Sequence, residues 1–486
     1  MDAEGIIGIN FGTAYTTVVH ITKEKITVLG EDGDTPFAAL IAVTADNKMF
    51  FGSRVKKGYN ALSETARLVS PLSELLGTNR AIVINGKECP PVQMAAEYFR
   101  ALKRVIMKKH SINVSEAVIS FPGSFSHAAK LDIIEAAKKA EIKVNGVIPE
   151  NYAAYMPMRG EVRNKRFVLI ADWGGRTLDI HILMNEQGRI HEKASFCERI
   201  GGNDIDLRIA QILHAMSSRL AENKSLVVPF EKMPAADRDK LINLAEAAKI
   251  RISTAGGNVP VNVTDYGNYG TFSFTLTEEI FSEIVKPIVE EHVITAINSA
   301  MSRAKLGAAD IGAVVACGGS GELRAFTDVL TNIFGKEKVI FPENTQIVSA
   351  LGAAAYMAYL KEVNGSGKFR LLEDIGVLMS DDNIFPLLKK DHAAEGLKSD
   401  VFSFAAVDDS PEAQIVIADG KGRILGNAAV PVRGFLNERL EISAMIDETL
   451  TASVRIHNSS DAGSENDTVL YLESTGTLQL TVDSTQ

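Results

Sequence analysis

Apolar and polar residues follow the same order in two short segments that lie far apart in the chain. Residues 6–18 read IIGINFGTAYTTV, and residues 168–180 read VLIADWGGRTLDI. Each segment has an apolar run, an Asn or Asp (Asn10, Asp172), a glycine turn with a threonine, and a second apolar run. Glycine tolerates the backbone angles of a tight turn, so this order is typical of a β-hairpin. We therefore expect two similar hairpins.

The pattern around these hairpins predicts strands that alternate with helices. Apolar runs predict strands at residues 114–121 and 311–317. Helical periodicity predicts helices at residues 126–141, 203–219, 235–252, 278–304 and 352–360, and in a segment that ends at Phe334. Strands interleaved with helices indicate an α/β architecture.

Beyond residue 367 the pattern changes to short alternating segments separated by Gly, Asn, Asp and Ser. These predict strands at residues 401–406, 413–418, 440–446, 452–457, 468–473 and 477–482. We expect the chain to divide into three parts: an α/β domain at residues 1–362, a linker at residues 363–380, and an all-β domain at residues 381–486.

Charge is distributed unevenly and separates the same regions. Residues 371–486 hold 20 acidic and 8 basic residues, a net charge of −12, while residues 1–370 carry a net charge of +2. The acidic C-terminal part argues against nucleic acid as a partner. No apolar run approaches the roughly 18 residues of a membrane helix, and the N-terminus lacks the basic and apolar regions of a secretion signal. We expect a cytoplasmic protein with no direct contact with a membrane.

The cysteines and the common catalytic motifs do not point to a reaction. Cys89, Cys197 and Cys317 have no metal-site spacing and cannot form a disulfide framework, so we expect buried free thiols. The sequence has no Walker-type phosphate loop, no HExxH motif and no serine-nucleophile elbow.

Four glycine-rich turns carry the remaining chemical signal. They are Gly12-Thr13, Gly174-Gly175-Arg176-Thr177, Gly201-Gly202-Asn203-Asp204 and Gly318-Gly319-Ser320. Consecutive amides in such turns form concave anion sites, and a helix that follows such a turn can add its own free amides. One Gly-Gly pair is usually only a turn. Four in one α/β chain, two of them in matching hairpins, predict a site that grips the phosphates of a nucleotide from both sides.

These motifs, in this order, resemble the heat-shock-70 (DnaK-type) chaperone family. The segments that carry the resemblance are residues 7–16, 168–183, 200–207, 314–334, 349–356, the linker at 371–378 and the β-region at 386–482. The resemblance implies the actin-like ATPase fold, which is duplicated into two lobes, followed by a small all-β sandwich that holds peptides.

The resemblance also implies which residues bind and act on a nucleotide. Catalysis would fall to Glu150, Asp172, Thr177 and Asp179, with Asp172 contacting Mg²⁺ through water. ATP or ADP would be held by Gly12, Thr13, Gly174, Gly175, Thr177, Gly201, Gly202, Glu246, Lys249, Ser253, Gly318, Gly319 and Ser320.

Four departures from the family fall within this set of motifs. Asn10 and Ser73 stand where the family has an aspartate and a lysine, and Ile250 and Glu322 replace two arginines that stack on adenine. Phosphoryl transfer depends on positioning and charge, and one lost transition-state donor costs about 3–4 kcal/mol of barrier. Each lost stacking contact costs roughly 0.5–2 kcal/mol of binding. We expect nucleotide binding with impaired or absent hydrolysis.

The family's β-domain is normally followed by a helical lid, and we expect this chain to be a lidless member. It is similar in truncation to the Ssz-type subunit of the ribosome-associated complex and to short bacterial DnaK-like proteins. The implied partners are a J-domain protein or another co-chaperone, and a polypeptide client held near residues 402–404 and 435–436. Two alternatives stay open: a slow but active ATPase chaperone, and a nucleotide-free scaffold subunit.

Overall fold

The structure is a computed structural model that describes residues 5–220, 228–363, 368–406, 410–433, 438–459, 467–472 and 476–482. The chain forms two compact units. The first contains Met1–Ile182 and Ser195–Ala358, and the second contains Leu183–Ala194 and Tyr359–Gln486. Each unit therefore combines segments that are distant in the sequence.

The first predicted hairpin lies in a six-stranded sheet of the first unit. Its strands run in the order β11-β10-β1-β2-β3, with β4 also paired to β2. They are β1 (Ile6–Phe11), β2 (Tyr15–Ile21), β3 (Ile26–Val28), β4 (Phe37–Ala38), β10 (Glu116–Phe121) and β11 (Lys143–Pro149). Strands β1 and β2 are antiparallel, whereas β10 runs parallel to β1. Ile9 and Phe11 are fully buried, so the hairpin is anchored by the core.

The second predicted hairpin lies in another sheet, in which the order is β18-β17-β12-β13-β14. These strands are β12 (Phe167–Trp173), β13 (Leu178–Glu186), β14 (Arg189–Glu198), β17 (Ala313–Cys317) and β18 (Val339–Ile340). The Gly174 amide donates to the Thr177 carbonyl at 2.9 Å, and the Gly12 amide donates to the Tyr15 carbonyl at the same distance. Both turns thus close in the same way, which confirms the predicted pair of hairpins.

The predicted helices occur in the predicted order, and further helices at residues 53–57, 59–65, 72–75, 91–110 and 150–162 were not predicted. The helices are α1 (Ser53–Lys57), α2 (Tyr59–Thr65), α3 (Leu72–Leu75), α4 (Pro91–His110), α5 (His127–Lys139), α6 (Glu150–Val162), α7 (Gly202–Leu220), α8 (Ala235–Ala255), α9 (Glu278–Ile288), α10 (Ile294–Ala304), α11 (Arg324–Phe334) and α12 (Val348–Glu362). The segment predicted as one helix at 278–304 contains a π-helical turn at Val289–Val293 between α9 and α10. It follows Pro287, which has no amide to donate to the helix.

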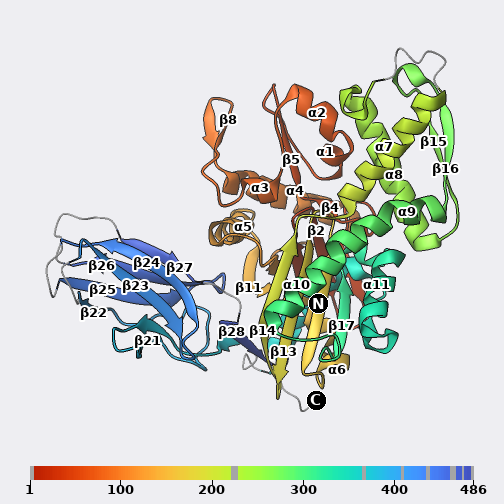
Figure 1. Cartoon of the computed structure of the whole chain (residues 1–486). Helices are drawn as coiled ribbons and strands as arrows, with labels where there is room; N and C mark the ends of the chain where they lie inside the picture. Colours follow the sequence, from red (N-terminus) through yellow and green to blue (C-terminus); the bar gives the residue numbers. More distant parts are fainter. Residues whose placement is uncertain are drawn as a thin grey trace. The chain divides into compact units, whose positions relative to one another are not determined.

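Short strands complete the first unit. They are β5 (Leu40–Thr44), β6 (Met49–Phe51), β7 (Ala66–Pro71), β8 (Ile82–Ile84), β9 (Lys87–Cys89), β15 (Val259–Val263) and β16 (Phe272–Leu276). Helices α7 and α8 lie beside the β15–β16 hairpin (Figure 1). The C-terminal end of α8 lines a pocket of this unit.

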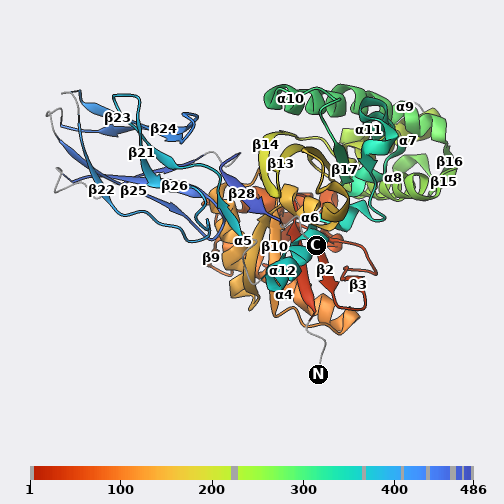
Figure 2. The ribbon, with the colours of Figure 1, turned by 90° about the horizontal axis from the view of Figure 1, so that it is seen from below.

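The second unit contains a sandwich of two antiparallel sheets, which Figure 2 shows as two layers of blue strands. One sheet has the order β21-β20-β23-β24 and the other β22-β25-β26-β27. The strands are β20 (Ile375–Leu378), β21 (Ile384–Leu388), β22 (Phe402–Ala405), β23 (Glu412–Asp419), β24 (Ile424–Pro431), β25 (Arg439–Ile446), β26 (Ala452–Asn458) and β27 (Thr468–Tyr471). Five of the six predicted strands of this region lie here.

The sixth predicted strand, at residues 477–482, has different partners from those expected. Within the described residues, β28 (Leu478–Thr481) pairs with β19 (Phe369–Leu371) and with residues 189–191 of β14, rather than with a sandwich sheet. The Gln479 amide is buried and donates to Asp391 at 3.0 Å. Alternation of apolar residues predicts that a segment is a strand, but it does not predict the partner.

Three further expectations can be compared with the structure. The three cysteines are free, but Cys197 is exposed and Cys89 only half-buried, so the expected burial holds for Cys317 alone. No described helix is long and apolar enough to cross a lipid bilayer. The groove candidate at residues 435–436 lies outside the described residues.

Candidate functional site

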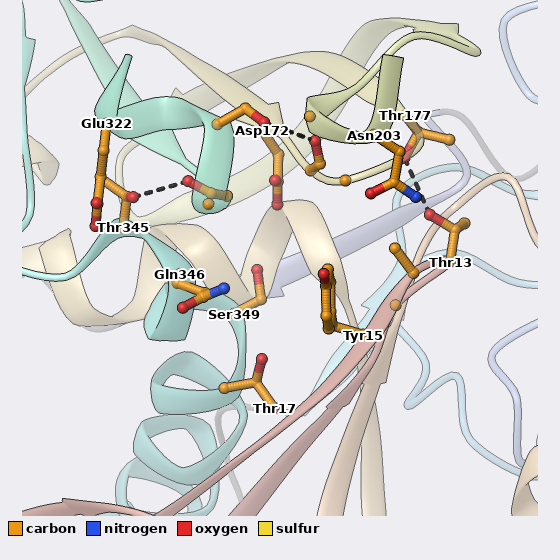
Figure 3. Close-up of a pocket in the computed structure, with 18 of the residues that line it drawn as sticks. Thr13, Tyr15, Thr17, Asp172, Thr177, Asn203, Glu322, Thr345, Gln346 and Ser349 are labelled. Atoms are coloured by element: carbon orange, nitrogen blue, oxygen red, sulfur yellow. Dashed lines mark hydrogen bonds between the residues drawn. The ribbon is translucent and has the colours of Figure 1, made fainter. Parts of the chain in front are cut away.

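A pocket with about 1050 Å³ of atom-free space lies between the two hairpin turns of the first unit. Gly12 and Thr13 line it from the first turn, and Gly174, Gly175 and Thr177 from the second. The Thr13 and Thr177 side chains point toward one another, with 3.4 Å between their hydroxyl oxygens (Figure 3). The two turns therefore face each other across the pocket.

Three carboxylates and one amide form the acidic part of the pocket. Glu150 begins α6, Asp172 lies near the end of β12, and Asp179 lies on β13. The Asn10 side-chain amide donates to the Glu150 carboxylate at 2.8 Å, and Ser120 donates to the Asn10 oxygen at 3.1 Å. Asn10 is thereby fixed as a neutral donor to the carboxylate of Glu150.

Burial and mutual repulsion disfavour negative charge on Glu150 and Asp172. Burial, followed by the charges of Asp172 and Asp179, holds the pKa of Glu150 well above its usual range. Burial and the Asp179 charge raise the pKa of Asp172 to about 7. A positive charge nearby would reverse both shifts.

This set of carboxylates fits a divalent cation that keeps its water shell. Among the described residues, no three His, Cys, Asp or Glu side chains converge closely enough to hold an ion directly. Mg²⁺ loses water reluctantly and is often held through its water molecules by carboxylates. The donors of the pocket are therefore suited to hydrated Mg²⁺ better than to a directly coordinated metal.

The short helix α3 contacts both hairpin turns from outside the pocket. The Ser73 hydroxyl donates to the Thr13 carbonyl at 3.1 Å, and Glu74 forms an ion pair with Arg176 of the second turn. Ser73 is therefore adjacent to the first turn, although it does not itself line the pocket. At this position, where the resemblance implies a lysine, the chain has a neutral hydroxyl beside Thr13.

Helix α8 supplies a further part of the pocket wall. Glu246, Lys249, Ile250 and Ser253 line it from this helix. Lys249 donates to the Gly202 carbonyl at 2.9 Å and forms an ion pair with Asp206 at 2.8 Å. The Lys249 ammonium is thus already engaged by the protein.

Tyr15 of β2 and Lys56 of α1 contact Glu246. The Tyr15 hydroxyl donates to Glu246 at 3.1 Å, and the Lys56 ammonium contacts both Glu246 and Tyr15. Burial raises the pKa of Glu246, but the charge and hydrogen bond of Lys56 outweigh it and leave this pKa below its usual value. Farther along α8, Asp239 accepts from the Asn60 and Ala61 amides of α2 at 2.8 and 2.9 Å. Helix α8 is therefore tied to α1 and α2.

The remaining glycine turns pack against the second hairpin. Ser320 donates to the Gly174 carbonyl at 2.9 Å, and Thr345 donates to the Gly318 carbonyl at 2.7 Å. Gly318 has a φ of 78°, and a Cβ there would overlap the Trp173 backbone, so only glycine fits. The Gly202 amide donates to the Gly174 carbonyl at 3.1 Å. These contacts make the three turns one continuous wall.

Most of the residues expected from the sequence lie in this pocket. Those that line it are Asn10, Gly12, Thr13, Glu150, Asp172, Gly174, Gly175, Thr177, Asp179, Gly202, Glu246, Lys249, Ser253, Gly318, Gly319 and Ser320. Gly201 does not line it but packs so closely against Gly175 that a Cβ would overlap that residue. Ile250 and Glu322 also line it, and burial raises the pKa of Glu322.

Other lining residues were not named as nucleotide-binding from the sequence, although Asn203 lies in one of the four glycine-rich turns and Ser349 begins a segment that carries the resemblance. They are Ala14, Tyr15, Thr17, Pro122, Asn203, Leu323, Thr345, Gln346 and Ser349. Side chains two residues apart in a strand lie on the same face. Because Thr13 was expected in the site, this rule could also have identified Tyr15 and Thr17. Thr345, Gln346 and Ser349 belong to no turn motif, and Figure 3 shows them on a separate part of the wall.

The comparisons with known proteins agree with this geometry. The family model described as Hsp70 protein matches residues 6–428, which include both hairpins and the whole pocket. The chain is also similar to the chaperone protein DnaK of Mycoplasmopsis synoviae (strain 53), with 26% identity over 442 residues, covering 87% of this chain and 70% of that protein. The resemblance seen in the sequence is confirmed, and with it the two-lobed actin-like ATPase fold followed by a β-sandwich. The chain belongs to the Hsp70 family of chaperones.

Proposed function

We propose that this chain is a non-standard Hsp70-family chaperone or co-chaperone that binds ATP or ADP with Mg²⁺ and hydrolyses ATP slowly or not at all. The observation that carries the proposal is the state of Asn10. It is a neutral amide, bonded to Glu150 at 2.8 Å, where the resemblance implies a carboxylate. In this proposal the amides of the glycine turns still bind the nucleotide. The carboxylate that the resemblance implies at position 10 is missing.

The residues of the pocket divide into three roles in this proposal. The amides of the two hairpin turns, with Thr13 and Thr177, hold the phosphates. Glu246, Lys249 and Ser253 of α8 hold the adenosine. Asp172, together with Glu150 and Asp179, would hold Mg²⁺ through its water molecules. When bound, Mg²⁺ neutralises charge on the phosphates.

Impaired hydrolysis follows from the charges around the phosphate turns. Ser73 has its hydroxyl bonded to the Thr13 carbonyl and carries no charge. Among the described residues that line the pocket, Lys249 is the only lysine or arginine, and it is bound to Asp206. A lost transition-state donor costs about 3–4 kcal/mol of barrier, and two such losses would silence a slow ATPase.

The output of the protein would be a conformational change that a partner detects. The partner would be a J-domain protein or another co-chaperone, and the sandwich would hold a polypeptide weakly. In the sandwich, Phe385 of β21 packs edge-on against Phe402 and Phe404 of β22, with ring centroids 5.0 and 5.3 Å apart. Phe385 is 37% exposed, so this aromatic cluster offers apolar surface to a peptide.

Calorimetric titration with ATP, with and without Mg²⁺, tests the binding part of the proposal. We expect micromolar binding that requires Mg²⁺. The absence of binding at millimolar ATP would refute it and would favour the scaffold alternative.

Turnover tests the second part. Wild-type protein should show negligible ATP hydrolysis, even with a J-domain protein and peptide, and the pair Asn10→Asp with Ser73→Lys should raise it. A matched control is Asn10→Asp with Ser63→Lys, because Ser63 is an exposed residue of α2 and adds the same charge elsewhere. Clear turnover by the wild-type protein would instead establish the active ATPase alternative.

A further inference from the structure

A nucleotide would bring several negative charges into a pocket that is already acidic. Five carboxylate residues line it: Glu150, Asp172, Asp179, Glu246 and Glu322. Lys249 is the only lysine or arginine among the described lining residues, and its ammonium contacts Asp206 and the Gly202 carbonyl. Apart from the turn amides and a bound cation, a positive side-chain charge for phosphates at the hairpin turns would have to come from a residue that does not line the pocket.

Arg176 is placed to supply this charge. It lies in the second turn between Gly175 and Thr177, both of which line the pocket. Its side chain is 37% exposed and pairs with Glu74, whose side chain is 53% exposed. An exposed ion pair of this kind stabilises little, because water competes for both partners. The guanidinium can therefore change partner at small cost.

The contacts of α3 hold this arginine near the place where the two turns meet. Ser73 of α3 bonds to the Thr13 carbonyl, the next residue Glu74 pairs with Arg176, and Thr13 lies 3.4 Å from Thr177 across the pocket. These contacts form a closed ring through α3 and both turns. The guanidinium is consequently attached one residue from Thr177, at the edge of the proposed phosphate site.

We infer that Arg176 is a phosphate-binding residue, with Glu74 as its resting partner in the nucleotide-free protein. The guanidinium leaves Glu74 and contacts the terminal phosphate of a nucleotide held between the two turns. Planar guanidinium groups bind phosphate oxygens through two parallel hydrogen bonds, which are stronger than an exposed ion pair. The inference rests on the proposed function, and it assigns to the second turn the positive charge that the resemblance places at position 73.

The test compares ATP with AMP, because AMP lacks the phosphates that the arginine would contact. Affinities for both, with Mg²⁺, would be measured by calorimetry for the wild type, Arg176→Ala and Glu74→Gln. We expect Arg176→Ala to weaken ATP binding about tenfold to a hundredfold relative to AMP binding. Glu74→Gln should not weaken ATP binding, since it releases the guanidinium. Arg176→Lys should recover part of the loss.

A matched control comes from α4, where Arg100 pairs with Glu97 and has the same 37% exposure. Arg100→Ala should leave both affinities unchanged. Both Arg176→Ala and Glu74→Gln break the same ion pair, so a purely structural role predicts losses of the same sign for both variants. Equal losses for ATP and AMP, or an unchanged ATP affinity in Arg176→Ala, would overturn the inference while leaving the proposed function intact. Failure of the wild-type protein to bind ATP would overturn the proposed function itself.

Discussion

The most direct perturbation of the acidic part of the pocket is Asn10→Asp. This substitution keeps the shape of the side chain but replaces the amide donor, 2.8 Å from the Glu150 carboxylate, by an acceptor. Because burial holds the pKa of Glu150 well above its usual range, this bond is made to a largely neutral carboxyl group, and such a hydrogen bond contributes about 0.5–1.5 kcal/mol. Two ionised carboxylates about 3 Å apart would repel by roughly 5 kcal/mol at an effective dielectric constant of 20. The new carboxylate and Glu150 would therefore share a proton.

The Mg²⁺-free Asn10→Asp protein should accordingly lose about 0.5–1.5 kcal/mol of unfolding free energy relative to the wild type. Millimolar Mg²⁺ should restore most of this loss, because the cation compensates the added charge. Denaturant unfolding with EDTA and with Mg²⁺ measures both quantities. The control Asn10→Ala removes the same donor without adding charge, so it should be destabilised in both conditions. Equal stability of Asn10→Asp and wild type in EDTA would refute this reasoning.

Three further outcomes are expected. Because burial raises the pKa of Asp172 to about 7, the metal-free protein should lose about 1.4 kcal/mol of unfolding free energy between pH 6 and pH 8. Asp172→Asn should shrink this pH dependence, and a flat wild-type profile would contradict the assignment. Gly352→Ala should lower the free energy of unfolding by about 3 kcal/mol in denaturant unfolding, because its Cβ would overlap the Ala153 carbonyl. Gly160 lies in open space, so Gly160→Ala should raise the free energy of unfolding by about 0.5–1 kcal/mol. Asp239→Ala removes the acceptor of the α2 amides and so releases α8. Fluorescent ADP should then dissociate about tenfold faster in stopped-flow measurements. An unchanged rate would argue that the contact between α2 and α8 does not constrain the pocket.

The hairpins and most helices were predictable because their signals are local. Gly12 and Gly174 mark turns between apolar runs, and Ser126 caps α5 by accepting from the Ala129 amide, as its position in the sequence suggests. Most residues of the pocket were predictable for a different reason: the family resemblance implies which positions of the chain bind or act on a nucleotide.

The remaining features depend on contacts between distant residues. Thr345 and Gln346 line the pocket because the fold brings residues after β18 next to the hairpins, and no local sequence pattern predicts that. The ion pair between Glu74 and Arg176 joins residues 102 positions apart. Tyr15 and Lys56 acquire their roles only because Glu246 of α8 lies opposite them.

The position of β28 has a consequence for how the protein is made. Residues 479–481 pair with residues 189–191, so about 290 residues of chain separate the two partners. During synthesis from the N-terminus, the edges of β14 and β19 that pair with β28 remain unpaired until β28 has been made. Contacts of such long range also close slowly. Only a translation product that extends to β28 can complete this sheet. Shorter products would expose unpaired strand edges to proteases and to association with other chains.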